Sequence, residues 1–273
     1  MLRSVSPPTD TEALLTIAHV DGRVVVADKP AGLLCVPGRG PDRADCLARR
    51  VQVQWPDALV VHRLDMDTSG LVVFGRGAAM QRALSIAFAE RRVHKRYEAV
   101  VAGLLADEAG EINLPLAADW PNRPRQQVDR AAGKPSLTRW QVLARDEARG
   151  TTRLALTPIT GRSHQLRVHL AAIGHAILGD TLYAPAPWAQ AAPRLLLHAC
   201  ALSLPALADG LDDGLDDRLE VGLADLPADP LIDPVIDPLI DPLIDPLTGP
   251  LKDALKVALN NARVQHFTSP TPF

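Results

Sequence analysis

The sequence has few cysteines and no long apolar run, and each of these shortages excludes a class of protein. The 3 cysteines, Cys35, Cys46 and Cys200, form no CxxC pair. This argues against a disulfide framework and a structural zinc site, so we expect buried thiols and no metal. No stretch of 18 apolar residues occurs, and residues 1–10 lack the apolar segment of a signal peptide. We therefore expect no membrane span and a cytoplasmic protein.

Acidic residues are concentrated near the end of the chain. Residues 1–205 contain 25 Lys and Arg against 19 Asp and Glu, whereas residues 206–273 contain 4 against 13. The formal net charge of -3 therefore hides a basic body and an acidic tail. A basic body suits a polyanionic partner, but the excess is modest, and charge alone leaves nucleic acid binding open.

The acidic tail contains a short repeat. Asp-Pro recurs at positions 229, 233, 237, 241 and 245. Proline at every fourth position is incompatible with a helix or with the interior of a sheet. We therefore predict one folded domain over residues 1–228 and a disordered tail over 229–273, in which the spacing of 251–264 would allow a short amphipathic helix.

The apolar patterns of the body predict strands with a few helices between them. Residues 114–128 are rich in proline and are predicted to be an irregular surface loop. Predicted strands lie at 17–27 with a turn at Asp21–Gly22, at 58–61, 70–74 and 98–104, within 133–143, and at 151–156. Predicted helices lie at 45–54, at 77–90, from an N-cap at Ser163, and at the start of 193–204 before a strand.

Asp65 lies in the stretch VHRLDMDTSG, residues 61–70, between two predicted strands. Reactive side chains are often presented from connections of this kind on a rigid scaffold. An Asp after a strand is, however, more often a turn former or a helix cap. The stretch alone does not decide between these interpretations.

The densest basic cluster, residues 91–96, stands directly before Tyr97, one of only 2 tyrosines. The simpler interpretation is a solvated turn whose cations are favourable at a helix C-terminus. The alternative, which we favour, is a phosphate contact that leads to an aromatic ring able to stack on a base.

His164 and His169 suggest a metal site only superficially. Five residues along a helix turn through about 500°, so the two imidazoles would diverge by roughly 140° and could not face one ion. We expect structural or RNA-facing histidines instead.

Four groups of residues together resemble the RluA family of RNA pseudouridine synthases. The resemblance covers residues 14–205, and the segments at 120–124 and 195–199 narrow it to members that act on both ribosomal RNA and tRNA. The four groups are DKPAG at 28–32, HRLD with TSG at 62–65 and 68–70, Lys95 with Tyr97, and GRSHQLRVH at 161–169.

This resemblance implies a fold and a reaction. The fold is α+β, with a mixed, mostly antiparallel central sheet, flanking helices and a catalytic cleft that holds Asp65. The enzyme is an isomerase that breaks the uridine N1–C1′ bond, turns the base and joins C5 to C1′ without a cofactor. Expected substrates are structured RNA loops, in 23S ribosomal RNA and the tRNA anticodon stem-loop. We expect a monomer whose catalytic domain, residues 1–228, has no S4-type RNA-binding module.

The resemblance also implies a role for each site residue. Asp65 would act as nucleophile or base, Tyr97 would stack on the extruded base, and Arg167 would pair with Asp65. Desolvation would raise the pKa of Asp65, and a guanidinium within ~4 to 6 Å would lower it. Arg63 would help displace the uridine from its stack. The implied RNA contacts are Arg63, Lys95, Arg96, Arg123, Arg162, His164, Gln165 and Leu166.

Two rival functions remain at this point. A catalytically silent RNA-binding protein or chaperone could use the same scaffold, but binding alone does not need Asp65, Tyr97 and Arg167 together. A carboxylate-dependent glycosidase would need a second acid. Asp67 is close in sequence, but its spacing from Asp65 does not define an acid and base pair.

Overall fold

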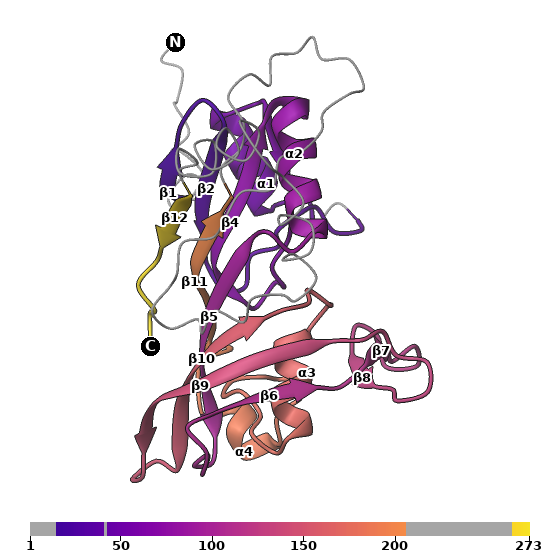
Figure 1. The fold of residues 1–273 in the computed structure, drawn as a ribbon, viewed down its shortest axis with the longest axis vertical. Coiled ribbons are helices and arrows are strands. Elements are labelled where there is room, and N and C mark those ends of the chain that lie inside the picture. The colour runs from indigo at the N-terminus through magenta and orange to yellow at the C-terminus, as the bar shows by residue number, and fades with distance from the viewer. Residues whose placement is uncertain (1–14, 41–42, 206–263) are drawn as a thin grey trace, which may run out of the picture. The chain divides into compact units, whose positions relative to one another are not determined.

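The computed structural model describes residues 15–40, 43–205 and 264–273 (Figure 1). The Asp-Pro repeat and most of the predicted helix at 251–264 lie outside this part. The chain divides into two compact units. The first comprises residues 1–202 with 267–273, and the second, residues 203–266, falls largely outside the described part.

A ten-stranded sheet forms the main architecture. Its order is β1-β2-β4-β11-β5-β10-β9-β6, with β3 beside β4 and β12 beside β11. β4 and β11 run parallel, whereas β2 pairs with β1 and β4, β10 pairs with β5 and β9, and β9 pairs with β6, all in antiparallel register. The predicted mixed, mostly antiparallel sheet is therefore confirmed. The strands are β1 (Thr16–Val20), β2 (Val24–Lys29), β3 (Ala58–Val60), β4 (Ser69–Arg76), β5 (His94–Ala102), β6 (Ala109–Asn113), β9 (Leu137–Asp146), β10 (Thr151–Pro158), β11 (Leu197–Leu204) and β12 (Gln265–Thr268).

Two hydrophobic cores pack against this sheet. One joins β2 and β4 to the helix α1 (Leu47–Gln54), and α2 (Gly77–Ala89) also contacts β4. The other joins β5 and β10 to α3 (Gln165–Ala172). Figure 1 shows these helices beside their strands, with the short α4 (Ala186–Ala189) near α3. Tyr97 packs against both cores, so it marks the place where they meet. No helix in the described part is long and apolar enough to cross a membrane.

Gly70 allows a parallel contact that brings distant parts of the sheet together. β4 meets β11 through Ser69 opposite His198 and Gly70 opposite Ala199. Gly70 has a φ of 117°, and a Cβ there would collide with the backbone of Ala199. A side chain at this position would therefore force the two strands apart. The turn that carries Asp65 ends directly before this contact.

Three local predictions were wrong. The strand predicted at 98–104 begins and ends earlier, because β5 runs from His94 to Ala102 and so includes Lys95 and Arg96. No helix forms before β11, because Leu196 instead bonds through its backbone with Leu178 and Val100. Residues 114–128 are not wholly irregular, since β7 (Leu116–Ala118) and β8 (Gln126–Val128) pair as an antiparallel hairpin.

The disordered tail predicted over 229–273 is wrong at its end. Gln265–Thr268 form β12, which pairs with β11. The sequence did not reveal this strand, because four residues of alternating exposure give only a weak pattern.

A buried chain of polar side chains fixes the residue that follows β12. The Ser69 hydroxyl meets His198 Nδ1 at 3.0 Å, and His198 Nε2 meets the Ser269 hydroxyl at 3.1 Å. Ser269 in turn donates to a carboxylate oxygen of Asp28. Ser69, His198 and Ser269 are all buried. Because unsatisfied buried polar groups are costly, this chain ties the C-terminal residues to β2, β4 and β11.

We predict that Ser269→Ala lowers the free energy of unfolding by about 1–3 kcal/mol, because His198 and Asp28 each lose a buried partner. Urea denaturation of the full chain measures the change. Ser203→Ala is the matched control, since Ser203 bonds with His266 at an exposed site and should cost less than about 0.5 kcal/mol. Equal effects of the two substitutions would contradict the role of the buried chain.

Candidate active site

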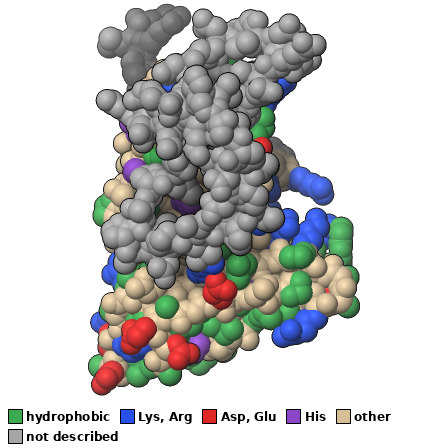
Figure 2. Space-filling view, viewed as in Figure 1, with side chains coloured by type: hydrophobic (Ala, Val, Ile, Leu, Met, Phe, Trp, Pro, Cys, Tyr) green, Lys and Arg blue, Asp and Glu red, His purple; other side chains and the backbone are tan. Residues whose placement is uncertain are grey.

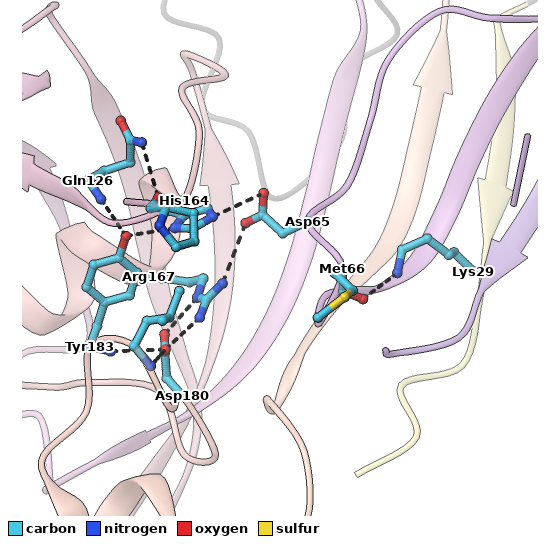
Figure 3. Close-up of polar contacts among 10 residues, drawn as sticks. Lys29, Asp65, Met66, Gln126, His164, Arg167, Asp180 and Tyr183 are labelled. Atoms are coloured by element: carbon cyan, nitrogen blue, oxygen red, sulfur yellow. Dashed lines mark hydrogen bonds and ion pairs between the residues drawn. The ribbon is translucent and has the colours of Figure 1, made fainter. Parts of the chain in front are cut away.

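A buried lysine stabilises the turn that carries Asp65. Lys29 is fully buried, and its ammonium donates to the carbonyl oxygens of Pro30, Leu33 and Met66 at 2.8 to 2.9 Å. Burial lowers the pKa of Lys29 to about 8. Three acceptors match the three donors of a charged ammonium. The DKPAG segment therefore supports the Asp65 turn from the adjacent strand (Figure 3).

His62 fixes the other side of this turn. Its Nε2 accepts a hydrogen bond from the backbone N–H of Val73 at 3.0 Å, and its ring stacks on Phe88. Burial, with the charge of Lys95, lowers the pKa of His62 to about 3. A neutral ring is required here, because a protonated Nε2 could not accept the N–H of Val73. His62 is thus a structural residue of the HRLD motif.

Asp65 faces two basic side chains and is partly open. Its side chain is 28% exposed. Arg167 Nη1 lies 4.0 Å from one carboxylate oxygen and His164 Nε2 lies 3.9 Å from the other. Figure 3 shows both side chains pointing toward the carboxylate. These separations are too long for hydrogen bonds but short enough for electrostatic attraction.

Arg167 forms the predicted ion pair with Asp65 at 4.0 Å, and it also has a closer partner in Asp180, which the sequence did not predict. Two parallel bonds of 2.8 and 2.7 Å join the guanidinium to the Asp180 carboxylate. Their side chains are 2% and 0% exposed. Burial acts to lower the pKa of Arg167, but the bonds and charge of Asp180, with the charge of Asp65, raise it overall. Arg167 therefore remains a fixed cation beside Asp65.

Asp180 is itself held by the backbone around it. Its Oδ1 accepts the N–H groups of Leu182 and Tyr183 at 3.0 and 3.1 Å. The preceding Gly179 has a φ of 74°, and a Cβ there would collide with the backbone of Arg194. Only glycine fits this close approach without strain. The GD dipeptide is thus a rigid support for Arg167.

His164 adopts a left-handed conformation that aims its ring at Asp65. It is the N-cap of α3, with φ 53° and ψ 17°, so the helix begins after the predicted N-cap Ser163. This conformation is uncommon for a residue with a Cβ and clusters at functional sites. The Tyr183 hydroxyl meets His164 Nδ1 at 2.7 Å and also accepts the N–H of Gln126 at 2.8 Å.

These bonds favour one tautomer of His164. Because the Tyr183 oxygen already accepts an N–H, its own hydrogen is free to go to His164 Nδ1. A neutral His164 then carries its proton on Nε2, which faces Asp65. Burial lowers the pKa of His164, against the opposing charge of Asp65. Hydrogen bonds therefore run from Gln126 through Tyr183 to His164, whose Nε2 lies 3.9 Å from a carboxylate oxygen of Asp65.

Tyr97 is the third residue of the predicted catalytic set. It lies on β5 opposite Leu156 of β10 and packs against both cores. Burial, together with the charge of Asp65, raises the pKa of Tyr97, so its hydroxyl stays protonated near neutral pH. That hydroxyl forms no hydrogen bond with any residue that the structure describes. Its hydroxyl therefore has no partner among the described residues and can bond with a ligand near Asp65.

The other predicted RNA contacts fall into two groups. Arg63, Arg123 and Arg162 are exposed, and Lys95 and Arg96 are partly buried on β5. The prediction was wrong for Gln165, whose buried amide bonds with Thr160, Leu137, Thr138 and the N–H of Arg162. All of its hydrogen-bonding groups are engaged within the protein, so it shapes the turn before α3. Leu166 is also buried, within the core that touches Tyr97.

Sequence reasoning missed Asp180 and Tyr183, which complete the site. Asp180 lies in a segment, 174–180, that gives no periodic signal. Tyr183 offered a signal, because it is one of only 2 tyrosines and the other was singled out. His164 and His169 do have separate partners, as their divergence predicted. His169 is buried and bonds with Thr138 and the carbonyl of Leu114.

Comparison with known proteins assigns the family. The sequence model of the family described as RNA pseudouridylate synthase matches residues 23–172, more than half of the chain. The chain therefore belongs to the RNA pseudouridylate synthase family, as the motifs predicted. This range includes Asp65, Tyr97, His164 and Arg167.

Individual members of the family are similar to this chain over most of their own length. A dual-specificity RNA pseudouridine synthase RluA of Pasteurella multocida is 50% identical over 198 residues, which cover 72% of this chain and 89% of the relative. The protein of the same description from Escherichia coli K12 is 46% identical over 203 residues, covering 74% and 91%. The solved structure of human RNA Pseudouridylate Synthase Domain Containing 1 has a TM-score of 0.62 and 25% identity, and covers 98% of this chain and 100% of its own.

Asp180 is expected to act as a positioning residue. Asp180→Asn should lower the free energy of unfolding by about 3–5 kcal/mol, because a buried cation loses its charged partner. It should also lower kcat by about 10²-fold with a smaller change in KM, because Arg167 is no longer held in place. Glu98→Gln is the matched control. It breaks the partly buried pair with Arg153, whose side chain is 36% exposed, and should cost clearly less than Asp180→Asn.

Stability should fall in acid partly because of His62. Its folded pKa of about 3 lies below the ordinary 6.5, so the unfolded chain binds the proton more readily between these values. Stability is therefore full above about pH 6.5 and is lost as pH falls toward 3, by at most about 1.4 kcal/mol per pH unit from this residue. His62→Gln keeps an acceptor for Val73 and should reduce the slope of unfolding free energy against pH. Burial also lowers the pKa of His169 and His198, so the slope should not vanish. An unchanged slope would contradict the assignment.

Proposed function

We propose that this chain isomerises uridine to pseudouridine in structured RNA loops, with Asp65 as the reacting carboxylate. The observation that carries this proposal is the arrangement around Asp65. A partly open carboxylate lies beside a fixed guanidinium and a neutral imidazole, and a tyrosine with an unengaged hydroxyl packs at the same junction. This set suits a reaction on one nucleotide that needs a carboxylate and a stacking ring.

The residues support each stage of the isomerisation. Tyr97 would stack on the extruded uracil, and exposed Arg63 would occupy the space that the base leaves. The N1–C1′ bond breaks, the base turns, and C5 bonds to C1′; C5 then loses its proton while N1 gains one, so the composition is unchanged. Asp65 would serve either as nucleophile at C1′ or as base at C5.

Arg167 and His164 would assist without reacting. The fixed charge of Arg167 lies 4.0 Å from the Asp65 carboxylate and attracts it electrostatically. His164 can present an N–H toward the same carboxylate. Because Asp180 and Tyr183 hold these two groups before substrate binds, little reorganisation is needed during the reaction.

The likeness to dual-specificity relatives, with the sequence motifs, supports two kinds of substrate. We propose loops in ribosomal RNA, in particular 23S RNA, and the anticodon stem-loop of tRNA. A cytoplasmic monomer without a cofactor remains our prediction, as do the cleft around Asp65 and the catalytic domain over residues 1–228.

The rival functions fit the site less well. A glycosidase needs a second carboxylate to act as acid. Asp180 cannot serve, because Arg167 and two backbone N–H groups occupy its oxygens. An RNA chaperone would gain nothing from a buried Arg167–Asp180 pair aimed at Asp65.

Asp65→Asn tests the proposal. Pseudouridine formation should fall by at least about 10²–10⁴-fold, because the group that must attack or accept a proton is lost. RNA affinity should be retained, since the exposed arginines are untouched. The measurement is pseudouridine mapping of ribosomal RNA and tRNA from a strain without the gene, after wild type or variant is returned.

Asp67→Asn is the control for this test. Asp67 lies two residues along the same turn, and its loss should reduce activity less than tenfold. Full modification by the Asp65→Asn protein would sink the proposed mechanism. Loss of pseudouridine with both variants would instead favour a paired-carboxylate reaction.

A further inference from the structure

The loop between β7 and β8 presents an exposed tryptophan beside an arginine. Trp120 is 68% exposed, and the guanidinium carbon of Arg123 lies 3.3 Å from the centroid of its ring. We call residues 119–125 the Trp120 loop. A guanidinium at this distance covers one face of the indole. Most of the exposed area must therefore belong to the opposite face and the edges.

Hydrogen bonds within the Trp120 loop hold this arrangement. The N–H of Asp119 donates to the carbonyl of Arg125 at 3.0 Å, and the N–H of Arg125 donates to the carbonyl of Asn122 at 3.0 Å. The Asn122 amide donates to both carboxylate oxygens of Asp119. The acidic residue of the loop is thus occupied by a neutral amide. Arg123 stays free of a carboxylate.

Exposed cations lie on the hairpin that carries this loop and on the segment directly after it, residues 129–134. Arg123, Arg125, Arg130 and Lys134 are all exposed. Within the described residues, none of the four forms an ion pair. Arginines elsewhere do pair, for example Arg139 with Glu111, Arg145 with Glu108 and Arg153 with Glu98. Figure 2 shows Lys and Arg side chains on the side of the molecule where Figure 1 places β7 and β8.

The Trp120 loop is also connected to the candidate active site. Gln126, directly after the loop, donates its N–H to the Tyr183 hydroxyl, which meets His164. The guanidinium carbon of Arg125 lies 5.4 Å from the centroid of the Tyr183 ring. A ligand held by this loop would therefore reach from the hairpin toward Asp65.

We propose that Trp120, backed by Arg123, stacks on an unpaired base of the RNA substrate other than the target uridine. An exposed ring with one free face suits any nucleobase, and the surrounding cations suit the phosphates on either side. This inference rests on the proposed function, because it adds a second nucleotide subsite to the same reaction. The subsite selects RNA that has unpaired nucleotides near the target.

Binding to two RNA probes tests the subsite. One is a hairpin with an unpaired loop that contains uridine, and the other is a blunt duplex with the same stem. Trp120→Ala in the full chain should weaken hairpin binding about tenfold or more and leave duplex binding unchanged. Trp120→Phe should retain most of the affinity, because phenylalanine keeps a ring. The value of kcat at saturating hairpin should stay within about twofold of wild type.

A matched pair of variants tests the role of Arg123. Arg123→Gln should weaken hairpin binding and reduce the slope of log affinity against log salt by about 0.7 to 1. Arg149→Gln removes one cation from the turn between β9 and β10, where Arg149 is 83% exposed, and should change neither quantity. Equal effects of the two substitutions would overturn the role of Arg123.

A fluorescent base gives a direct readout of stacking. With 2-aminopurine placed at each loop position in turn, wild type should quench one position that Trp120→Ala does not. The proposal is overturned if Trp120→Ala leaves hairpin affinity and quenching unchanged. The same result is expected if Trp120 binds a protein instead of RNA. Equal losses on hairpin and duplex would overturn it as well.

The same samples separate this proposal from the proposed function. Pseudouridine formation by wild type is measured on the hairpin that is used for binding. A wild type that makes no pseudouridine on any RNA, but binds the hairpin through Trp120, would defeat the function and leave the subsite standing. If Trp120→Ala makes pseudouridine as well as wild type at limiting RNA, the subsite alone is defeated.

Discussion

The buried pair of Arg167 and Asp180 is the interaction on which the site depends. Removing two charges from water is costly, and a bidentate geometry with further hydrogen bonds is what offsets that cost. Here Leu182 and Tyr183 supply those bonds to Asp180 from the backbone. Any movement of the loop at 179–183 would leave a charge unpaired, so the loop, α3 and the guanidinium form one rigid element.

This rigid element also places the residues that surround Asp65. Tyr183 follows Asp180 closely, and its hydroxyl holds the ring of His164. His164 in turn begins α3, the helix that carries Arg167. On the other side, Lys29 and His62 fix the Asp65 turn against β2 and β4. Two independently stiffened parts therefore face each other across Tyr97, which packs against both cores.

Sequence alone predicted the parts of this arrangement that have local signals. Strands such as Gly70–Phe74 and helices such as 77–90 follow from apolar runs, and the HRLD and GRSHQLRVH motifs marked Asp65 and Arg167. The partner of Arg167 could not be found in this way, because Asp180 lies thirteen residues later in an aperiodic loop. Gln165 misled for a related reason: a polar residue in a motif does not show whether its amide faces solvent or the interior. The final strand was hidden because its pairing partner, β11, lies far back in the chain.

Asp65 and Asp180 differ in how their carboxylates are bonded, and this difference explains why Asp65 can react. A carboxylate in a bidentate pair with arginine has its lone pairs engaged, and attack or proton abstraction would first require those bonds to break. Asp180 is in that state. Asp65, at 4.0 Å from Arg167 and 3.9 Å from His164, experiences their fields without donating its lone pairs to either. Because Asp180 holds Arg167 so tightly, the guanidinium cannot close on Asp65 and block it. The second carboxylate thus keeps the cation close enough to attract Asp65 and far enough to leave Asp65 free for a substrate.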